Sequence, residues 1–270
     1  MNFPIFSKNG NILPIEEARV SLMSVEYAYG FGVYETIRVK NDKAVFLADH
    51  IERLESSANI INLEHKFSKE DIEKYVVDFI AQAKRGTFNL KILLVGGQTK
   101  EDAVLYIMGS NPLFVDKKLY QEGAKVITTK YERIYPQAKT LNMLSSYIAY
   151  KEAKEKDCYD ALLVNREGNI TEGTRTNFFA VKGNIIYSPF EKGILLGVMR
   201  KHVIDVAKQN GFMVEENNIP FASISEYDGA FLTSTSTKIL PIKKIDDFEY
   251  PEIPSALKKL MAAFDAIINQ

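Results

Sequence analysis

The chain has 270 residues, of which 46% are hydrophobic and 26% charged, which is the composition of an ordinary globular protein with one or two domains. Its 34 Lys and Arg residues against 35 Asp and Glu residues leave a net charge of −1, so no basic excess indicates nucleic acid or an anionic membrane as a partner. The single cysteine, Cys158, excludes an intrachain disulfide and a multi-cysteine metal site, and the three histidines lack the spacing of metal ligands. The sequence shows no signal-peptide pattern and no apolar run long enough to cross a bilayer, which predicts a cytoplasmic protein.

The first 110 residues predict four strands, then two helices, then two further strands. The dipeptide Asn9-Gly10 predicts a tight hairpin turn, Ile51 and Leu54 begin the apolar spacing of a helix, and Ser68 forms a capping box before a second helix. Short apolar runs predict strands at 3–6, 12–15, 33–39, 44–47, 90–95 and 103–108.

Residues 111–123 carry an Asn-Pro dipeptide, mixed charges and no sustained apolar period. These features predict an interdomain linker, with an N-terminal domain over 1–110 and a C-terminal domain over 124–270.

The second half also mixes short strands with helices. Polar turns at 166–169 and 182–184 join short strands, which favours an α+β fold over a doubly wound sheet. Strands are predicted at 124–129, 160–164, 177–181 and 230–233, and helices at 145–156, 198–210 (ended by Gly211) and 249–270.

Two segments could carry covalent or acid–base chemistry. Lys139 lies in a loop before an apolar stretch, where it is either a solvated surface residue or a desolvated amine able to form a Schiff base. Glu172 and Arg175 lie between a polar turn and an apolar strand. They form either a surface salt bridge, or an acid aimed at a cofactor's ring nitrogen with a cation for an anionic substrate.

Further segments suit an anion. Gly197 directly precedes a predicted helix, whose free N–H groups attract negative charge. Five consecutive hydroxyl residues, 233–237, follow an apolar strand, and Arg53 lies on the polar side of a helix. The alternatives are a polar loop or helix cap for the first two segments and a solvated helix arginine for Arg53.

Taken in order, these segments resemble the class IV aminotransferases, the fold-type-IV pyridoxal-phosphate enzymes that include branched-chain aminotransferases, D-amino-acid aminotransferases and aminodeoxychorismate lyases. The resemblance runs from about Tyr29 to Ile242, nearly the whole chain. Its motifs are Tyr29-Gly-Phe-Gly-Val-Tyr34-Glu35-Thr-Ile-Arg38, His50-Ile-Glu-Arg53-Leu, Lys139-Thr-Leu-Asn, Thr171-Glu172-Gly, Leu196-Gly197-Val198-Met199-Arg200 and Phe231-Leu-Thr-Ser-Thr235-Ser236-Thr237.

The resemblance implies two α+β domains with pyridoxal 5'-phosphate between them. By this resemblance, Lys139 binds the cofactor covalently and moves the proton during transamination, while Glu172 pairs with the pyridinium nitrogen. Tyr29 reaches into the site of a partner subunit, which implies a homodimer or a multiple of dimers. The residues implied to hold the phosphate are Arg53, Val198 and Met199 through their amides, and Thr235, with Ser236 beside them. The residues expected to face the substrate are Tyr29, Tyr34, Arg38, Lys91, Arg175 and Thr237.

Two departures from the family pattern concern the substrate carboxylate. Lys91 stands where branched-chain enzymes have an arginine, and Arg175 replaces the second glycine of their glutamate turn. We hypothesise that Arg175 contacts the substrate carboxylate; the alternative is a salt bridge at a domain interface.

The expected activity is a transaminase that acts on small amino acids and 2-oxo acids, moving an amino group between an aliphatic, branched-chain-type amino acid and an acceptor such as 2-oxoglutarate. One alternative is a D-amino-acid transaminase with an unusual carboxylate site at Arg175. Another is an aminodeoxychorismate lyase, which eliminates pyruvate. A binding protein without activity is disfavoured, because a relaxed site would lose costly polar groups such as Lys139 and Glu172 first.

Overall fold

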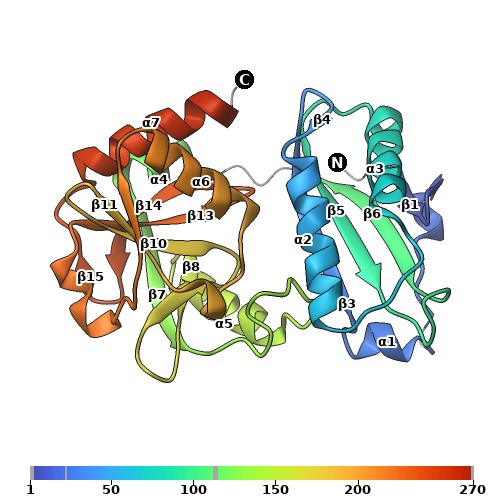
Figure 1. The fold of residues 1–270 in the computed structure, drawn as a ribbon, viewed down its shortest axis with the longest axis horizontal. Helices are drawn as coiled ribbons and strands as arrows, with labels where there is room; N and C mark the ends of the chain where they lie inside the picture. Colours follow the sequence, from blue (N-terminus) through green and yellow to red (C-terminus); the bar gives the residue numbers. More distant parts are fainter. Residues whose placement is uncertain (1–2, 22, 112–114, 269–270) are drawn as a thin grey trace. The chain divides into compact units, whose positions relative to one another are not determined.

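The computed structural model describes residues 3–21, 23–111 and 115–268, which form two compact units (Figure 1). The first unit holds the described residues up to 111 together with the segment Ala138–Asn142. The second unit holds residues 115–137 and 143–268. Each unit has its own hydrophobic core.

The first unit is built on a six-stranded sheet in the order β2-β1-β6-β5-β3-β4, with antiparallel pairing throughout. The predicted hairpin is confirmed, because β1 and β2 pair around Asn9 and Gly10, whose φ angles of 52° and 84° suit a tight turn. The strands are β1 (Ile5–Lys8), β2 (Asn11–Pro14), β3 (Gly32–Lys40), β4 (Lys43–Ala44), β5 (Phe88–Val95) and β6 (Val104–Ser110).

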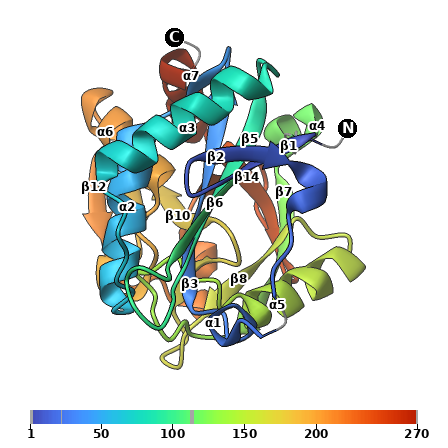
Figure 2. The ribbon, with the colours of Figure 1, turned by 90° about the vertical axis from the view of Figure 1, so that its right-hand side faces the viewer.

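The helices of the first unit are α1 (Val25–Ala28), α2 (Leu47–Ile60) and α3 (Lys69–Ala83), with a 3-10 helix η1 (Ile15–Glu17). Helix α2 contacts β3, and α3 contacts β1 and β6 (Figure 2). The predicted capping box is confirmed, because Ser68 accepts a bond from the N–H of Asp71 and the Asp71 carboxylate accepts one from the N–H of Ser68. The strand predicted over 44–47 is wrong beyond Ala44, because Phe46 adopts a φ of 55° and α2 starts directly after it.

Strand β3 presents alternate residues to the two faces of the sheet. Glu35 lies on the face covered by the helices and is fully buried. Tyr34, Thr36 and Arg38 point the other way and are half-buried, and Lys91 of β5 pairs with Thr36 on the neighbouring strand. We call this second face, defined by these four residues, the polar face.

The second unit is built on a nine-stranded mixed sheet in the order β12-β11-β10-β13-β14-β7-β8-β9, with β15 paired to β14. Strand β9 also pairs with β10 through Glu172 and Asn177, so six strands from β10 round to β9 form a closed ring. The strands are β7 (Ala124–Lys130), β8 (Asp160–Val164), β9 (Ile170–Gly173), β10 (Asn177–Lys182), β11 (Ile185–Ser188), β12 (Met213–Glu216), β13 (Gly229–Ser234), β14 (Lys238–Ile245) and β15 (Phe248–Glu249).

The helices of the second unit are α4 (Lys117–Glu122), α5 (Leu144–Glu155), α6 (Val198–Gln209) and α7 (Ser255–Ile268), with 3-10 helices η2 (Glu191–Gly193) and η3 (Phe221–Glu226). Helix α5 packs on β7 and β8, and α6 contacts α7 and β13 (Figure 1). The predicted end of α6 is confirmed, because Gly211 follows it with a φ of 80°. The helix predicted over 249–270 begins later, at Ser255, because Phe248 and Glu249 pair with β14 instead.

The segment expected to be a linker, 111–123, contains α4. This helix contacts β14, and Leu119 and Tyr120 pack against the core of the second unit. Residues 117–122 are therefore an integral part of that unit; residues 112–114 lie outside the described residues. Within the described ranges, no helix is long and apolar enough to cross a membrane.

Candidate active site

The segment carrying Lys139 lies beside β3 in the first unit. The N–H of Tyr34 donates to the carbonyl of Lys139 at 2.9 Å, and the N–H of Leu141 donates to the carbonyl of Gly32 at 2.8 Å. The N–H of Lys139 donates to the hydroxyl of Ser57 on α2 at 3.0 Å. A side chain at position 32 would collide with Leu141, so glycine permits this close approach. The backbone of Lys139 is thereby fixed on both sides.

The amine of Lys139 lies over the ring of Tyr34, 4.6 Å from its centroid. The amine of Lys91 lies 5.3 Å from the centroid of the same ring. Both amines therefore lie against the ring of Tyr34 on the polar face. Within the described part of the chain, neither Lys91 nor Arg38 forms an ion pair with a carboxylate.

Arg53, expected to bind phosphate, forms a buried cluster with Glu35 and His50. Its Nε and Nη2 atoms donate to the two carboxylate oxygens of Glu35, each at 2.7 Å, and His50 Nδ1 lies 2.7 Å from Oε2 of the same carboxylate. Burial raises the pKa of Glu35, but the charge of Arg53 and the hydrogen bonds from His50 and Arg53 outweigh it and hold the pKa at about 2. Burial lowers the pKa of His50, so the ring is neutral at pH 7. Glu35 thus fixes the orientation of the Arg53 guanidinium.

Glu172 lies on β9 in the second unit and is 2% exposed. Arg133 Nε donates to its Oε1 at 2.7 Å, while Arg133 Nη2 donates to the carbonyl of Thr174 at 2.8 Å. The N–H of Leu195 donates to Oε2 at 3.3 Å. The positive charge of Arg133 stabilises the carboxylate, so Glu172 presents a fixed negative charge. Sequence reasoning missed Arg133, because its partner is 39 positions away and no local pattern joins them.

Hydrogen bonds hold the loop before α6 to Glu172 and Asn177. The carbonyl of Leu195 accepts a bond from the Asn177 amide at 2.7 Å, and the N–H of the same residue donates to Glu172. Gly197 is the N-cap, and a side chain there would collide with Asn177. The first amides of α6, at Val198 and Met199, have no partner inside the helix, and such a helix start attracts negative charge.

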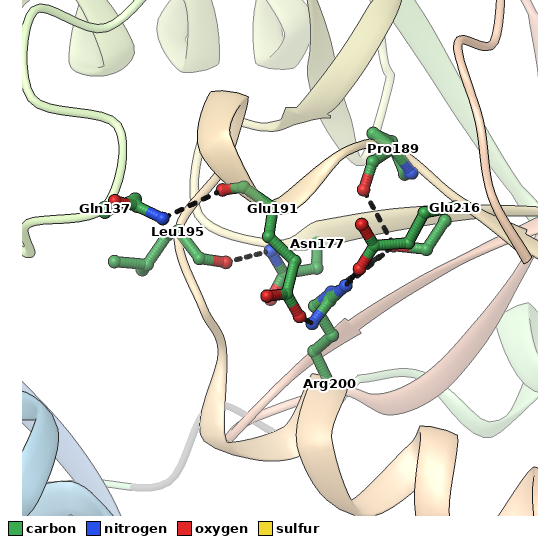
Figure 3. A network of polar contacts seen from close by, with 8 residues as sticks. Gln137, Asn177, Pro189, Glu191, Leu195, Arg200 and Glu216 are labelled. Atoms are coloured by element: carbon green, nitrogen blue, oxygen red, sulfur yellow. Dashed lines mark hydrogen bonds and ion pairs between the residues drawn. The ribbon is translucent and has the colours of Figure 1, made fainter.

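Arg200 holds the loop before α6 in place through contacts with two carboxylates and a hydroxyl. Figure 3 shows its guanidinium between the carboxylates of Glu191 and Glu216, at 3.0 and 3.3 Å. Its Nε and Nη2 atoms also donate to the hydroxyl of Ser188, and the side chain of Gln137 donates to the carbonyl of Glu191 at 3.3 Å. Arg200 is 4% exposed, so these contacts replace the water that its charge would otherwise require.

The hydroxyl-rich segment forms a turn between β13 and β14. The hydroxyls of Ser234 and Thr237 lie 2.9 Å apart, and the N–H of Thr237 donates to Ser234 Oγ at 3.2 Å. Tyr120 on α4 donates to the carbonyl of Thr237 at 2.9 Å. Thr235 and Ser236 lie between these contacts and are half-buried. Thr237, expected to face the substrate, is 1% exposed and closes the turn.

Two further predicted site residues lie at the surface. Arg175 is exposed, and its guanidinium carbon lies 3.7 Å from the centroid of the Tyr150 ring. Its side chain forms no ion pair within the described residues. Tyr29 follows α1 and is 82% exposed.

The donor set fits pyridoxal 5'-phosphate, the cofactor that the resemblance implies. Lys139 would offer an amine to the aldehyde, and the buried Glu172 carboxylate, bonded to Arg133, would suit the ring nitrogen. The start of α6 would supply backbone amides, which suit a phosphate.

The sequence matches the family model of the amino-transferases of class IV over residues 32–245. A D-alanine aminotransferase of Bacillus licheniformis is 29% identical over 248 residues, covering 88% of this chain and 87% of the relative. A probable branched-chain-amino-acid aminotransferase of Rickettsia conorii is 27% identical over 248 residues, covering 88% and 86%.

Solved structures show the same fold. The branched-chain amino acid aminotransferase of Escherichia coli has a TM-score of 0.91 at 22% identity, covering 98% of this chain and 95% of that chain. A T.th. branched-chain amino acid aminotransferase complexed with N-(5'-phosphopyridoxyl)-L-glutamate has a TM-score of 0.88 at 25% identity, covering 100% and 95%. A putative 4-amino-4-deoxychorismate lyase of Legionella pneumophila has a TM-score of 0.83 at 25% identity, covering 93% and 97%.

Proposed function

Since the chain belongs to the class IV aminotransferase family of pyridoxal-phosphate enzymes, we propose that it moves an amino group between an aliphatic, branched-chain-type amino acid and a 2-oxo acid such as 2-oxoglutarate. The observation that carries this proposal is the pair of cations on the polar face. The amines of Lys91 and Lys139 both lie against the ring of Tyr34, and Arg38 lies on the same face of the sheet as Tyr34. Cations without a carboxylate partner among the described residues, beside the reactive amine, favour a substrate with carboxylates, and 2-oxoglutarate carries two.

When bound, the cofactor supplies an electron sink that stabilises negative charge at the substrate's Cα. In our proposal Lys139 binds it covalently and then moves a proton at its Nζ atom. The ring of Tyr34, whose centroid lies 4.6 Å from that atom, positions the amine. Glu172 accepts a hydrogen bond from the ring nitrogen, and Arg133 keeps the Glu172 carboxylate ionised and oriented.

The proposed phosphate ligands are the amides of Val198 and Met199, the hydroxyls of Thr235 and Ser236, and Arg53. The helix terminus and the guanidinium each attract a dianion. Glu35 uses one edge of the Arg53 guanidinium, which fixes the direction of the other edge.

We also propose a homodimer, in which Tyr29 reaches the partner's site. This residue and three apolar neighbours on and around α1 leave unusually large areas exposed: 86% of Met23, 52% of Val25 and 44% of Tyr27. A second copy of the chain would cover them. Because free amino acids and 2-oxo acids are cytoplasmic metabolites, we place the reaction in the cytoplasm.

The relatives and Arg175 favour a second candidate, a D-amino-acid transaminase. The Bacillus licheniformis relative is named for D-alanine. Arg175 has no acidic partner among the described residues. In this candidate its guanidinium binds the substrate carboxylate in the orientation that a D-amino acid requires. The Legionella likeness keeps the lyase as a third candidate.

One experiment on the purified protein separates these candidates. Absorbance first measures bound cofactor, and half-reactions with L-leucine, L-glutamate, D-alanine and D-glutamate then measure its conversion to the pyridoxamine form. Conversion by the two L-amino acids supports the proposal, whereas conversion by the D-amino acids alone supports the second candidate. Bound cofactor that none of the four converts, with pyruvate released from aminodeoxychorismate, supports the lyase. A protein that binds no cofactor would overturn all three.

A further inference from the structure

The turn that carries Arg175 is fixed from inside by a buried carboxylate. Asp160, the first residue of β8, is 0% exposed. Its Oδ2 atom accepts a bond from the hydroxyl of Thr176 at 2.9 Å, and its Oδ1 atom accepts bonds from the hydroxyl and the N–H of Thr174. The N–H of Ala161 also donates to Oδ1, at 2.9 Å. Asp160 therefore holds both residues that flank Arg175.

Arg175 points outward because both of its neighbours point inward. Its guanidinium stacks on Tyr150 of α5, at 3.7 Å from carbon to ring centroid. A stacked guanidinium keeps the N–H groups at its edges available, and these match the two oxygens of a carboxylate. Arg175 has no acidic partner in the ranges that the structure describes.

A second cation lies against the same ring. Lys154 follows Tyr150 by one helical turn, and its amine lies 5.5 Å from the centroid of the Tyr150 ring and 5.4 Å from that of Tyr159. Lys154 too forms no ion pair within the described ranges. Burial raises the pKa of the Tyr159 phenol, and the charge of Arg175 offsets this only in part, so the phenol stays protonated at neutral pH and can donate a hydrogen bond.

We infer that Arg175, Lys154 and Tyr159 form a carboxylate-binding subsite for the amino or 2-oxo acid, in which Tyr150 is the positioning residue that holds Arg175. The inference rests on the transaminase activity proposed above and, within it, on the second candidate, which gives Arg175 a substrate carboxylate. It adds a role for Tyr150: stacking on this ring restricts the rotation of the exposed Arg175 side chain, so that the guanidinium is preorganised to bind a carboxylate. Preorganisation lowers the cost of binding and leaves the chemical step at Lys139 unaffected.

The test compares four variants of the cofactor-loaded enzyme. Tyr150→Leu removes the stacking ring, Tyr150→Phe keeps it, and Arg175→Ala removes the receptor itself. Tyr147→Leu, one turn earlier on α5 and 65% exposed, is the matched control. Two readouts are used: KM and kcat for 2-oxoglutarate, and the rise in melting temperature caused by succinate, a dicarboxylate that does not react.

We expect Tyr150→Leu to raise KM about three- to thirty-fold, the range of a cation–π contact, with kcat within about twofold of the parent. The succinate-induced rise in melting temperature should shrink in parallel. Tyr150→Phe and Tyr147→Leu should leave both readouts unchanged, and Arg175→Ala should change both at least as much as Tyr150→Leu.

Two results would overturn the inference, and they differ in what else they affect. If Arg175→Ala raises KM while Tyr150→Leu does not, Arg175 binds the carboxylate without needing the ring. If Arg175→Ala leaves KM and the succinate effect unchanged, the subsite itself is wrong, although transamination can proceed as proposed.

Discussion

The buried cluster of Glu35, His50 and Arg53 predicts a large loss of stability on a small chemical change. Glu35→Gln keeps the shape of the side chain but removes its charge, which leaves the Arg53 guanidinium without its carboxylate partner. A pKa of about 2, against an ordinary value of 4.5, corresponds to about 3 kcal/mol of stabilisation at neutral pH. Removing one partner of a buried ion pair costs a similar amount, about 3 kcal/mol or more.

The pH dependence provides a second, independent check. Because the pKa of Glu35 is lower in the folded protein, its contribution is complete above pH 4.5 and is lost as the pH falls toward 2. The difference in the free energy of unfolding between the parent and Glu35→Gln should therefore shrink from about 3 kcal/mol at about pH 7 to about 1 kcal/mol at about pH 3.

Urea denaturation of the cofactor-free protein, followed by circular dichroism at both pH values, measures these differences. Glu122→Gln is the matched control, since Glu122 pairs with Lys118 at 3.6 Å on the exposed side of α4. It should change the free energy of unfolding by less than about 0.5 kcal/mol. A loss below about 1 kcal/mol for Glu35→Gln at neutral pH, or a difference that does not shrink with acid, would refute the reasoning.

Three further predictions concern the second unit and α3. Gly197→Ala should weaken the affinity for pyridoxal 5'-phosphate about tenfold, because the added methyl collides with Asn177 at the start of α6; an unchanged dissociation constant in a fluorescence titration would contradict this. Glu172→Gln should still show the absorbance of bound cofactor but lose about 100-fold in kcat, because a neutral amide no longer keeps the ring nitrogen protonated; a kcat near that of the parent would exclude this role. Ser68→Ala should lower the free energy of unfolding by about 1 kcal/mol through loss of the capping box with Asp71, and thermal denaturation with no shift would disprove it.

Local signals in the sequence predicted the elements that local interactions determine. The hairpin at Asn9-Gly10, the cap at Ser68 and the end of α6 before Gly211 each depend on neighbours within a few positions. The strand predicted over 44–47 was wrong because no local signal marks the change of backbone direction at Phe46. This residue adopts a left-handed backbone conformation, which is rare for phenylalanine and which the sequence therefore does not indicate.

Features of the site that depend on distant residues could not be predicted from local patterns. Arg133 binds Glu172, which is 39 positions away in the sequence. Arg175, in a turn, stacks on Tyr150, which belongs to a helix earlier in the chain. The direction of Lys91 depends on which face of β5 turns toward Tyr34, and β5 is so apolar on both sides that its sequence does not show this.

The position of Ala138–Asn142 limits how this enzyme can be divided. The residues on either side belong to the second unit, yet Lys139 is held by β3 and by Ser57 of the first. A fragment starting at residue 115 would therefore contain the lysine without the strand and the helix that fix its backbone. In a chimera that takes only its first 110 residues from a relative, Lys139 would come from this chain, whereas the strand that holds it would come from the relative. Lys139 therefore cannot be transferred with the second unit alone, and an exchange of halves between related enzymes has to carry the segment Ala138–Asn142 along with the N-terminal piece.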